Sequence, residues 1–278
     1  MSTVPEAIRV ERSTLEIGDR TLWRDLSVRV PAGQFLTVIG PNGSGKTSLL
    51  KVLLGLLPSG GVVEVLGGPP RRGNPRIGYV PQQKAIDPDL PVRGRDLVRM
   101  GVDGGRWSLR GEPGASRRVQ EMLEAVGATA FGDAPIGRLS GGEQQRLRIA
   151  QALVGEPRLL LCDEPLLSLD LHHQREICEL IGSWQRRSGG TVVFVTHDVN
   201  PVLSLTDRML AVVGGRWAAG SPSQILTGAT MSELYGVPVD VLRVKGRVVV
   251  LADAGDPVGG HHEGPSEPAT PPLPEGVR

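Results

Sequence analysis

Short apolar runs alternate with amphipathic stretches along most of the chain, and this pattern predicts the fold. Residues 35–39 (FLTVI) are almost all apolar, as in a strand that is buried on both faces. A glycine-rich break follows, and residues 46–57 then have the pattern of a helix that ends before Pro58. The same rhythm predicts strands at 62–66, 77–80, 158–162, 191–196 and 208–213, and helices at 142–154 and 172–187. Such alternation favours an α/β fold with a mostly parallel sheet covered by helices.

Three segments depart from this rhythm. Residues from about 85 to 137 contain no apolar strand run but do contain helical patterns such as 117–126, which indicates an inserted helical subdomain. Residues 239–251 have the pattern of a late β-hairpin or of paired strands. The final segment, 253–278, holds six prolines and five glycines and too few apolar residues to form a core, so we expect disorder there. The sequence therefore predicts one folded domain over 1–252 and a disordered tail.

Composition narrows the class of protein. The 31 basic and 30 acidic residues nearly cancel, and no dense Lys/Arg run occurs, so a nucleic-acid-binding surface is not expected. Only two cysteines are present, and their spacing suits neither a disulfide framework nor a metal site. The N-terminus lacks an apolar signal-peptide core, and no run approaches 18 uncharged apolar residues. We therefore expect no membrane-spanning segment, and a thiol such as that of Cys162, inside an apolar run, favours a reducing compartment.

The glycine-rich break fits the pattern G-x-x-x-x-G-K-[ST] and lies between a predicted strand and a predicted helix, as this phosphate-binding motif requires. Glycines let successive backbone N–H groups turn toward phosphate oxygens, and the helix start adds its positive dipole end. Lys46 would place its charge on the β- and γ-phosphates, and Thr47 would offer a hydroxyl to Mg²⁺. The predicted nucleotide-binding residues here are Gly40, Pro41, Asn42, Gly43, Ser44, Gly45, Lys46, Thr47 and Ser48.

A phosphate loop does not identify a reaction, because kinases, GTPases and many ATPases share it. The segment 139–146 (LSGGEQQR) narrows the choice. It is a second anion-binding device, with the hydroxyl of Ser140 and the amides of Gly141 and Gly142 at the start of a helical stretch. One chain has one copy of each device. Both could bind a single nucleotide only if two chains met head to tail.

These motifs make the chain resemble the ATP-binding subunits of ABC transporters over residues 7–250. Residues 139–146 are similar to the signature motif of that family, with Glu143 in place of the commoner Gln. The other family segments follow in order: a Q-loop at 77–82, a Walker B segment at 159–165, a D-loop at 168–170 and an H-loop at 196–198. The resemblance implies a P-loop NTPase core with an N-terminal antiparallel β element and an inserted α-helical subdomain. It also implies ATP hydrolysis with Mg²⁺.

The resemblance gives each matching residue a role. Asp163 would hold Mg²⁺, and Glu164 would act as general base on the attacking water; neighbouring strand positions face opposite ways, so the two cannot share a task. Gln82 would reach the Mg²⁺ and the water, and His197 would bond the γ-phosphate. Asp170 would cross to the opposite active site of a dimer. As catalytic residues we therefore predict Glu164, His197 and Gln82, and as metal ligands Thr47, Gln82 and Asp163.

One position departs from the family. Members usually carry an aromatic residue before the phosphate loop that stacks on adenine, and the matching position here is Ile17. We predict that Ile17 packs against adenine as a flat apolar contact. Trp23 lies six residues further on and could substitute, but a core position is the preferred interpretation for it.

The segments 86–92, 196–202 and 234–239 resemble the zinc/manganese importer branch of the family. This implies a homodimer attached to membrane-spanning permease subunits at the cytoplasmic face of the membrane, and an extracytoplasmic substrate-binding protein. The helical insertion would grip the permease. Alternatives are an exporter subunit, an importer of another substrate, or a non-transport ABC-type ATPase. The pair His261-His262 in the tail is interpreted as incidental.

Overall fold

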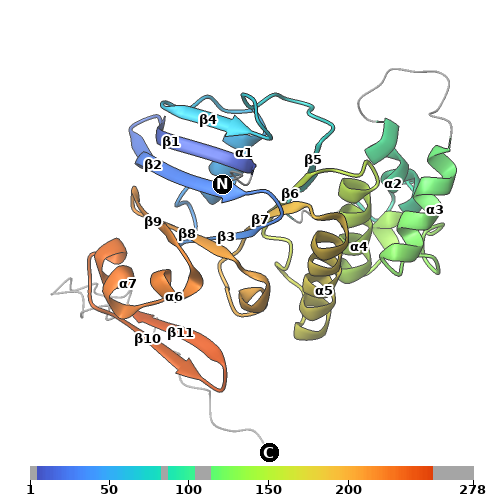
Figure 1. Ribbon diagram of the computed structural model, residues 1–278. Coiled ribbons are helices and arrows are strands. Elements are labelled where there is room, and N and C mark those ends of the chain that lie inside the picture. Colours follow the sequence, from blue (N-terminus) through green and yellow to red (C-terminus); the bar gives the residue numbers. More distant parts are fainter. Residues whose placement is uncertain (1–4, 83–86, 104–113, 253–278) are drawn as a thin grey trace, which may run out of the picture.

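The central sheet uses the most apolar segments of the chain. The computed structural model describes residues 5–82, 87–103 and 114–252. Its six-stranded sheet has the order β5-β6-β7-β3-β8-β9 (Figure 1). The strands are β3 (Phe35–Ile39), β5 (Ile77–Val80), β6 (Leu159–Asp163), β7 (Thr191–Val195), β8 (Arg208–Val213) and β9 (Arg216–Gly220). All neighbours pair in parallel except β8 and β9, which run antiparallel. The predicted mostly parallel sheet is confirmed.

Side chains alternate between two cores on either side of this sheet. Along β6, Leu159 and Leu161 enter one apolar cluster, and Leu160 and Cys162 enter the other. All five residues of this strand are buried, which explains why its sequence is a continuous apolar run. Burial raises the pKa of the Cys162 thiol, so this cysteine is a packing residue and not a nucleophile.

A second, antiparallel sheet covers one core. It has the order β2-β1-β4 and contains β1 (Glu6–Ile17), β2 (Arg20–Pro31) and β4 (Val62–Val65). The helix α1 (Lys46–Leu53) lies between the two sheets (Figure 1). This helix is one turn shorter than the predicted 46–57, because Gly55 has a φ of +68° and the chain turns there. The expected N-terminal antiparallel β element is confirmed.

Helices cover the opposite core. They are α4 (Gly141–Leu153) and α5 (Leu171–Ser188). Further out, α2 (Gly94–Asp103), α3 (Ala115–Ala125) and the 3₁₀ turn η1 (Ile136–Arg138) pack on α4 around an apolar cluster of their own. Between residues 87 and 138, the described part of the chain contains helices and turns and no strand. The division into domains and an insertion at 85–137 stays a prediction.

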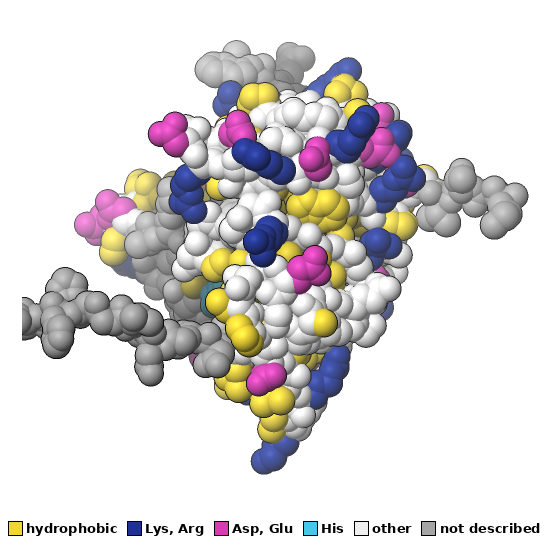
Figure 2. Space-filling view, turned by 90° about the vertical axis from the view of Figure 1, so that its left-hand side faces the viewer, with side chains coloured by type: hydrophobic (Ala, Val, Ile, Leu, Met, Phe, Trp, Pro, Cys, Tyr) yellow, Lys and Arg dark blue, Asp and Glu magenta, His cyan; other side chains and the backbone are white. Residues whose placement is uncertain are grey.

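The last described segment forms a separate lobe below β8 and β9 (Figure 1). The 3₁₀ turn η2 (Leu203–Leu205) precedes β8, and the lobe itself begins after β9 with α6 (Pro222–Ile225) and α7 (Gly228–Tyr235). The strands β10 (Val239–Val244) and β11 (Arg247–Ala252) then form the predicted hairpin. Figure 2 shows charges of both signs spread over the upper part of one face, and hydrophobic side chains gathered toward the narrow lower end. The sequence pattern carried no prediction for β9, α6 or α7.

The fold class is confirmed as α/β with a mostly parallel sheet. Within the described ranges, no helix is both long enough and apolar enough to cross a membrane. The expected disorder of 253–278 and the histidine pair in it lie outside the described residues, as do 83–86 after the Q-loop.

Candidate active site

The phosphate loop joins the end of β3 to the start of α1, as the motif requires. Gly43 and Gly45 have φ values of +76° and +105°, in the left-handed region that favours glycine. A Cβ on Gly45 would also lie 3.1 Å from the side chains of Leu22 and Trp23, which form the floor of the loop. The buried hydroxyl of Ser44 has no hydrogen-bond partner among the described residues. The loop therefore offers backbone amides and one unsatisfied hydroxyl in a confined cradle.

Lys46, the first residue of α1, directs its side chain back into the phosphate loop. Its ammonium donates hydrogen bonds to the carbonyl oxygens of Gly40 (2.8 Å) and Pro41 (3.0 Å). It also lies 3.6 Å from the carboxylate of Glu164. Only 5% of the lysine is exposed. A buried cation surrounded by these oxygens is placed to receive an anion in the loop.

Asp163 ends β6 and is held by two hydroxyl groups. The Thr47 hydroxyl donates to one carboxylate oxygen at 2.9 Å, and the Tyr79 hydroxyl donates to the other at 3.4 Å. Burial raises the pKa of Asp163, and the bond from Thr47 opposes that rise. Burial also raises the pKa of Tyr79 to about 12, helped by the charge of Asp163. The carboxylate of Asp163 is therefore buried, and no residue in the described part of the chain forms an ion pair with it.

Glu164 directly follows β6 and turns away from Asp163. Its φ of +47° is unusual for a non-glycine residue, and its N–H donates to Val195 O at 3.0 Å. One carboxylate oxygen lies 3.6 Å from Lys46 Nζ, and the other lies 3.5 Å from His197 Nδ1. The side chain of Glu164 is 11% exposed, whereas that of His197 is 55% exposed. The turn at Glu164 thus places a carboxylate between Lys46 and His197, the second residue after β7.

A hollow of about 450 Å³ lies over the loop. It is lined by Lys46, Thr47 and Glu164, by Gln82 after β5, and by Ile17 at the end of β1. Arg20 also lines it and donates from its guanidinium to Gly43 O at 3.3 Å. The structure therefore brings together predicted site residues from four separate segments.

Ile17 and Trp23 have different environments. Ile17 is half exposed at the rim of the hollow. Trp23 is fully buried, and its indole N–H donates to Ser13 Oγ at 3.2 Å. The core position preferred for Trp23 is confirmed, and this residue is unavailable for stacking on a base.

Ser140 caps the start of α4 and is occupied by its own helix. Its backbone N–H and its hydroxyl both donate to Glu143 Oε2 at 2.8 Å, and Glu143 N–H donates back to the hydroxyl at 3.3 Å. This is a complete capping box. The carboxylate of Glu143 thus lies at the positive end of the helix dipole, where a phosphate would also be favoured.

Asp170 caps α5 and lies beside the same surface. Its carboxylate accepts from the N–H groups of His172 and His173 at 2.9 Å and lies 2.7 Å from His173 Nδ1. The backbone bond from His173 is the largest influence that holds the pKa of Asp170 below its ordinary value. The His173 ring packs against Gly142, where a Cβ would lie 2.5 Å from it. Asp170 and the glycines of residues 140–142 are therefore neighbours.

The structure thus divides the predicted residues into two groups. The first group is the phosphate loop, residues 40–48, together with the residues around it: Ile17, Gln82, Asp163 and Glu164. His197 lies next to this group because it contacts Glu164. Residues 140–142 and Asp170 are not among the residues that line this hollow. Sequence reasoning missed Tyr79, although it lies in the Q-loop segment 77–82, and Arg20, which lies three residues after Ile17. Nothing in their local pattern signals a contact with Asp163 or Gly43.

The oxygen donors near Thr47 fit a hard cation. A hydroxyl, a carboxylate and an amide oxygen, from Thr47, Asp163 and Gln82, suit Mg²⁺, which typically takes one or two carboxylates plus substrate phosphates. Within the described ranges, no group of three or more His, Cys, Asp and Glu side chains forms a separate metal cage. The donor set therefore fits magnesium that arrives with a nucleotide better than a permanently held metal.

The chain is similar to proteins of one known family. The ABC transporter family profile matches residues 23–167. The zinc transport system ATP-binding protein TroB of Treponema pallidum (strain Nichols) is 37% identical over 238 residues, covering 85% of this chain and 89% of TroB. The zinc import ATP-binding protein ZnuC of Pseudomonas fluorescens (strain Pf0-1) is 36% identical over 231 residues, covering 82% of each chain.

Solved structures show the same fold. A metal-chelate type ABC transporter in an inward-facing conformation superposes with a TM-score of 0.78 at 26% identity, covering 90% of this chain and 99% of that one. CbiO1 of Clostridium perfringens, part of the ABC transporter complex cbiONQ, gives a TM-score of 0.69 at 26% identity, covering 82% of this chain and 93% of that one.

Proposed function

Because this chain belongs to the ABC transporter family and is an ATP-hydrolysing subunit, we propose that it powers the import of a divalent metal ion, specifically zinc. The observation that carries the proposal is the 36–37% identity to TroB and ZnuC over more than four fifths of the chain. The matched region extends well beyond the 145 residues of the family profile. Similarity to zinc transport subunits is therefore not confined to the ATP site.

In this proposal, ATP occupies the hollow over the phosphate loop. The amides of residues 40–45 and the ammonium of Lys46 bind the β- and γ-phosphates, and adenine lies on Ile17. Thr47, Asp163 and Gln82 would hold Mg²⁺, which, when bound, neutralises charge on the phosphate oxygens. The raised pKa of Asp163 supports this role, because a buried carboxylate without a cation gains most from one.

Glu164 and His197 would act on the γ-phosphate. Water attacks phosphorus while Glu164 takes its proton, and the bond to the β-phosphate oxygen breaks to leave ADP and inorganic phosphate. His197, 3.5 Å from Glu164, would donate to a γ-phosphate oxygen and hold the carboxylate in position. The turn at Glu164 supports this division of labour, since it separates this carboxylate from Asp163.

The second anion-binding device would act across a homodimer. Residues 140–142 and Asp170 line no part of their own chain's hollow, so we propose that each chain presents them to the ATP of the other. Binding of two ATP molecules then closes the dimer, and hydrolysis removes the phosphate that joined it. The helical segment that contains α2 and α3 would grip the cytoplasmic part of membrane-spanning permease subunits. An extracytoplasmic binding protein would deliver the ion.

Uptake measurements test the proposed cargo. The gene is removed from its host and replaced by the wild type or by Glu164→Gln, and radioactive zinc and manganese uptake are followed separately. We expect zinc uptake to be lost on removal and restored only by the wild type. Loss of manganese uptake alone would indicate another importer, and increased zinc retention would indicate an exporter; either result contradicts the proposal.

A further inference from the structure

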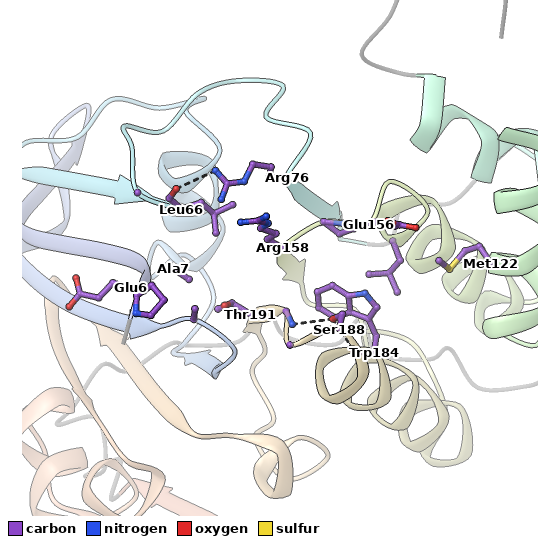
Figure 3. Close-up of a pocket in the computed structure, with 17 residues that line it drawn as sticks. Glu6, Ala7, Leu66, Arg76, Met122, Glu156, Arg158, Trp184, Ser188 and Thr191 are labelled. Atoms are coloured by element: carbon purple, nitrogen blue, oxygen red, sulfur yellow. Dashed lines mark hydrogen bonds between the residues drawn. The ribbon is translucent and has the colours of Figure 1, made fainter. Parts of the chain in front are cut away.

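A hollow of about 720 Å³, larger than the one over the phosphate loop, opens at the opposite edge of the central sheet (Figure 3). Arg76, Arg158 and Thr191 lie where β5, β6 and β7 begin, whereas the ATP site lies where the parallel strands end. Each of these strands rises by about 3.3 Å per residue, so roughly 15 Å of sheet separates the two edges. None of the predicted catalytic residues, Gln82, Glu164 and His197, lines this hollow.

Two arginines make one wall of the hollow cationic. Figure 3 shows Arg76 and Arg158 extending into the same part of it, near Leu66. The Arg76 guanidinium donates to Leu66 O at 3.4 Å, and neither arginine has an acidic partner among the described residues. Two neighbouring cations without a counter-charge repel each other, and an anion between them would relieve that repulsion.

The acidic residues of the lining do not supply that anion. Glu6 lies 3.7 Å from Arg29 and is directed away from the hollow. The carboxylate of Glu156 points away from Arg158 in Figure 3. The charge presented to an occupant is therefore positive.

The opposite wall is apolar and firmly built. Leu153, Met122 and Trp184 line it, and Trp184 is only 8% exposed. Ser188 Oγ donates to Trp184 O at 2.8 Å at the end of α5. A Cβ on Gly190 would lie 2.4 Å from the indole ring, which shows how closely the backbone supports it. Such a wall suits a flat or aliphatic group without rearrangement.

We propose that this hollow binds a small amphipathic anion, whose acidic group pairs with Arg76 and Arg158 and whose apolar body lies against Leu153 and Trp184. Guanidinium groups suit carboxylates, sulfonates and phosphates alike. The lining includes Ala7 of β1 and Met122 of α3, so an occupant would bridge the N-terminal sheet and the helical segment. The site would be distinct from the ATP site and open to a ligand while ATP is bound.

Calorimetric titration of the full chain with 1-naphthoate tests the proposal, with the neutral 1-naphthamide as the matched ligand. We expect naphthoate to bind at least about tenfold more tightly than naphthamide. The double variant Arg76→Gln/Arg158→Gln should lose that preference. The control Arg72→Gln/Arg187→Gln removes the same charge from exposed positions outside the hollow and should keep it. Saturating ATP with Mg²⁺ should leave naphthoate affinity unchanged.

Several results would overturn the proposal. These are the absence of naphthoate binding, equal binding by the Arg76/Arg158 variant, an equal loss in the control, and displacement of naphthoate by ATP. Deletion of residues 2–4, which precede Pro5 at the rim, provides a further test. If that deletion raises naphthoate affinity tenfold, the hollow receives the chain's own N-terminus and not a separate anion.

Discussion

The phosphate loop at residues 40–48, which we propose binds the chain's own ATP, and the signature segment at 139–146, which we propose contacts the ATP of a second chain, are built in different ways. Lys46 of the first is buried and lies beside Glu164, which directly follows β6 and in turn lies beside His197, two residues after β7. Ser140 of the second is exposed, and its side-chain partner lies three residues away. The first region is thus assembled by the fold, whereas the second is complete as a local motif.

This difference bears on how the two regions bind. The ammonium of Lys46 already lies among oxygen atoms of the same chain, so we expect a single chain to bind ATP. The signature segment holds its hydroxyl against Glu143, so a phosphate must compete with that carboxylate. We therefore expect changes in the first region to affect ATP binding and hydrolysis, and changes in the second to affect hydrolysis in the dimer but not ATP binding by a single chain.

Glu164→Gln should have the largest effect. Removal of the proposed general base should lower ATP hydrolysis by roughly 10²- to 10⁴-fold while ATP still binds, so that an ATP-bound dimer accumulates. Hydrolysis assays and size-exclusion chromatography with ATP and Mg²⁺ would measure both effects. Glu233→Gln, an exposed change on α7, should alter neither. A variant that stays monomeric and active would refute the proposed mechanism.

Ser140→Ala tests whether the signature segment acts only between chains. We expect hydrolysis to fall by roughly a hundredfold, as when one donor to a transition-state oxyanion is removed. ATP affinity of the isolated chain should change by less than about twofold, because the two regions are separate. Loss of the helix cap should also lower the free energy of unfolding by about 1 kcal/mol. If ATP affinity of the monomer falls as much as hydrolysis does, the division between the regions is wrong.

Glu143→Gln tests the competition at Ser140. Gln preserves the capping box but removes a negative charge from the place where a phosphate is expected. The ATP concentration for half-maximal hydrolysis should fall about two- to fivefold, consistent with the energy of one charge at a helix end. Glu179→Gln, an exposed change on α5, is the control. An increase in the required ATP concentration would show that the carboxylate assists binding.

Ile17→Tyr addresses the rim of the phosphate-loop hollow. An aromatic ring in place of Ile17 should stack on adenine and lower the KM for ATP by about threefold, a modest share of what stacking can supply. Val62→Tyr makes the same ring at a similarly exposed position on β4 and should leave KM unchanged. An unchanged or higher KM in Ile17→Tyr would argue against adenine contact at this residue.

Asp163→Asn removes a proposed Mg²⁺ ligand and should impair hydrolysis, but in the chain without Mg²⁺ and ATP we expect the smallest effect of this series, a change in stability. Burial raises the pKa of Asp163, so the folded chain binds this proton more tightly than the unfolded chain, and stability falls as pH rises through the two values. In EDTA near neutral pH, the variant should melt about 2 °C higher than the wild type. The gain should vanish at acidic pH, where both states are protonated. Asp19→Asn, at an exposed turn, is the control; a gain that is independent of pH would contradict this explanation.

Local pattern was sufficient for much of the fold. The apolar runs that became β3, β6 and β7 are buried on both faces, and a residue pattern of that kind has few other uses. By contrast, β9 and α6 have weak periodicity and are short, so their formation depends on packing against β8. The predicted end of α1 was wrong because the apolar pattern continues past Leu53, whereas the backbone turns at Gly55 and ends the helix.

The sequence by itself determined the phosphate loop, the signature segment and the order of the motifs, because each depends on residues that are adjacent in the chain. Only the tertiary structure decided which of them meet. It placed Glu164 between Lys46 and His197, and it brought the hydroxyl groups of Thr47 and Tyr79 within hydrogen-bond distance of Asp163. It also buried Trp23 beneath Gly45 and directed the Ser140 hydroxyl to Glu143. The physical reason is that parallel strands bring their ends to one edge of a sheet, so residues far apart in the chain become neighbours there.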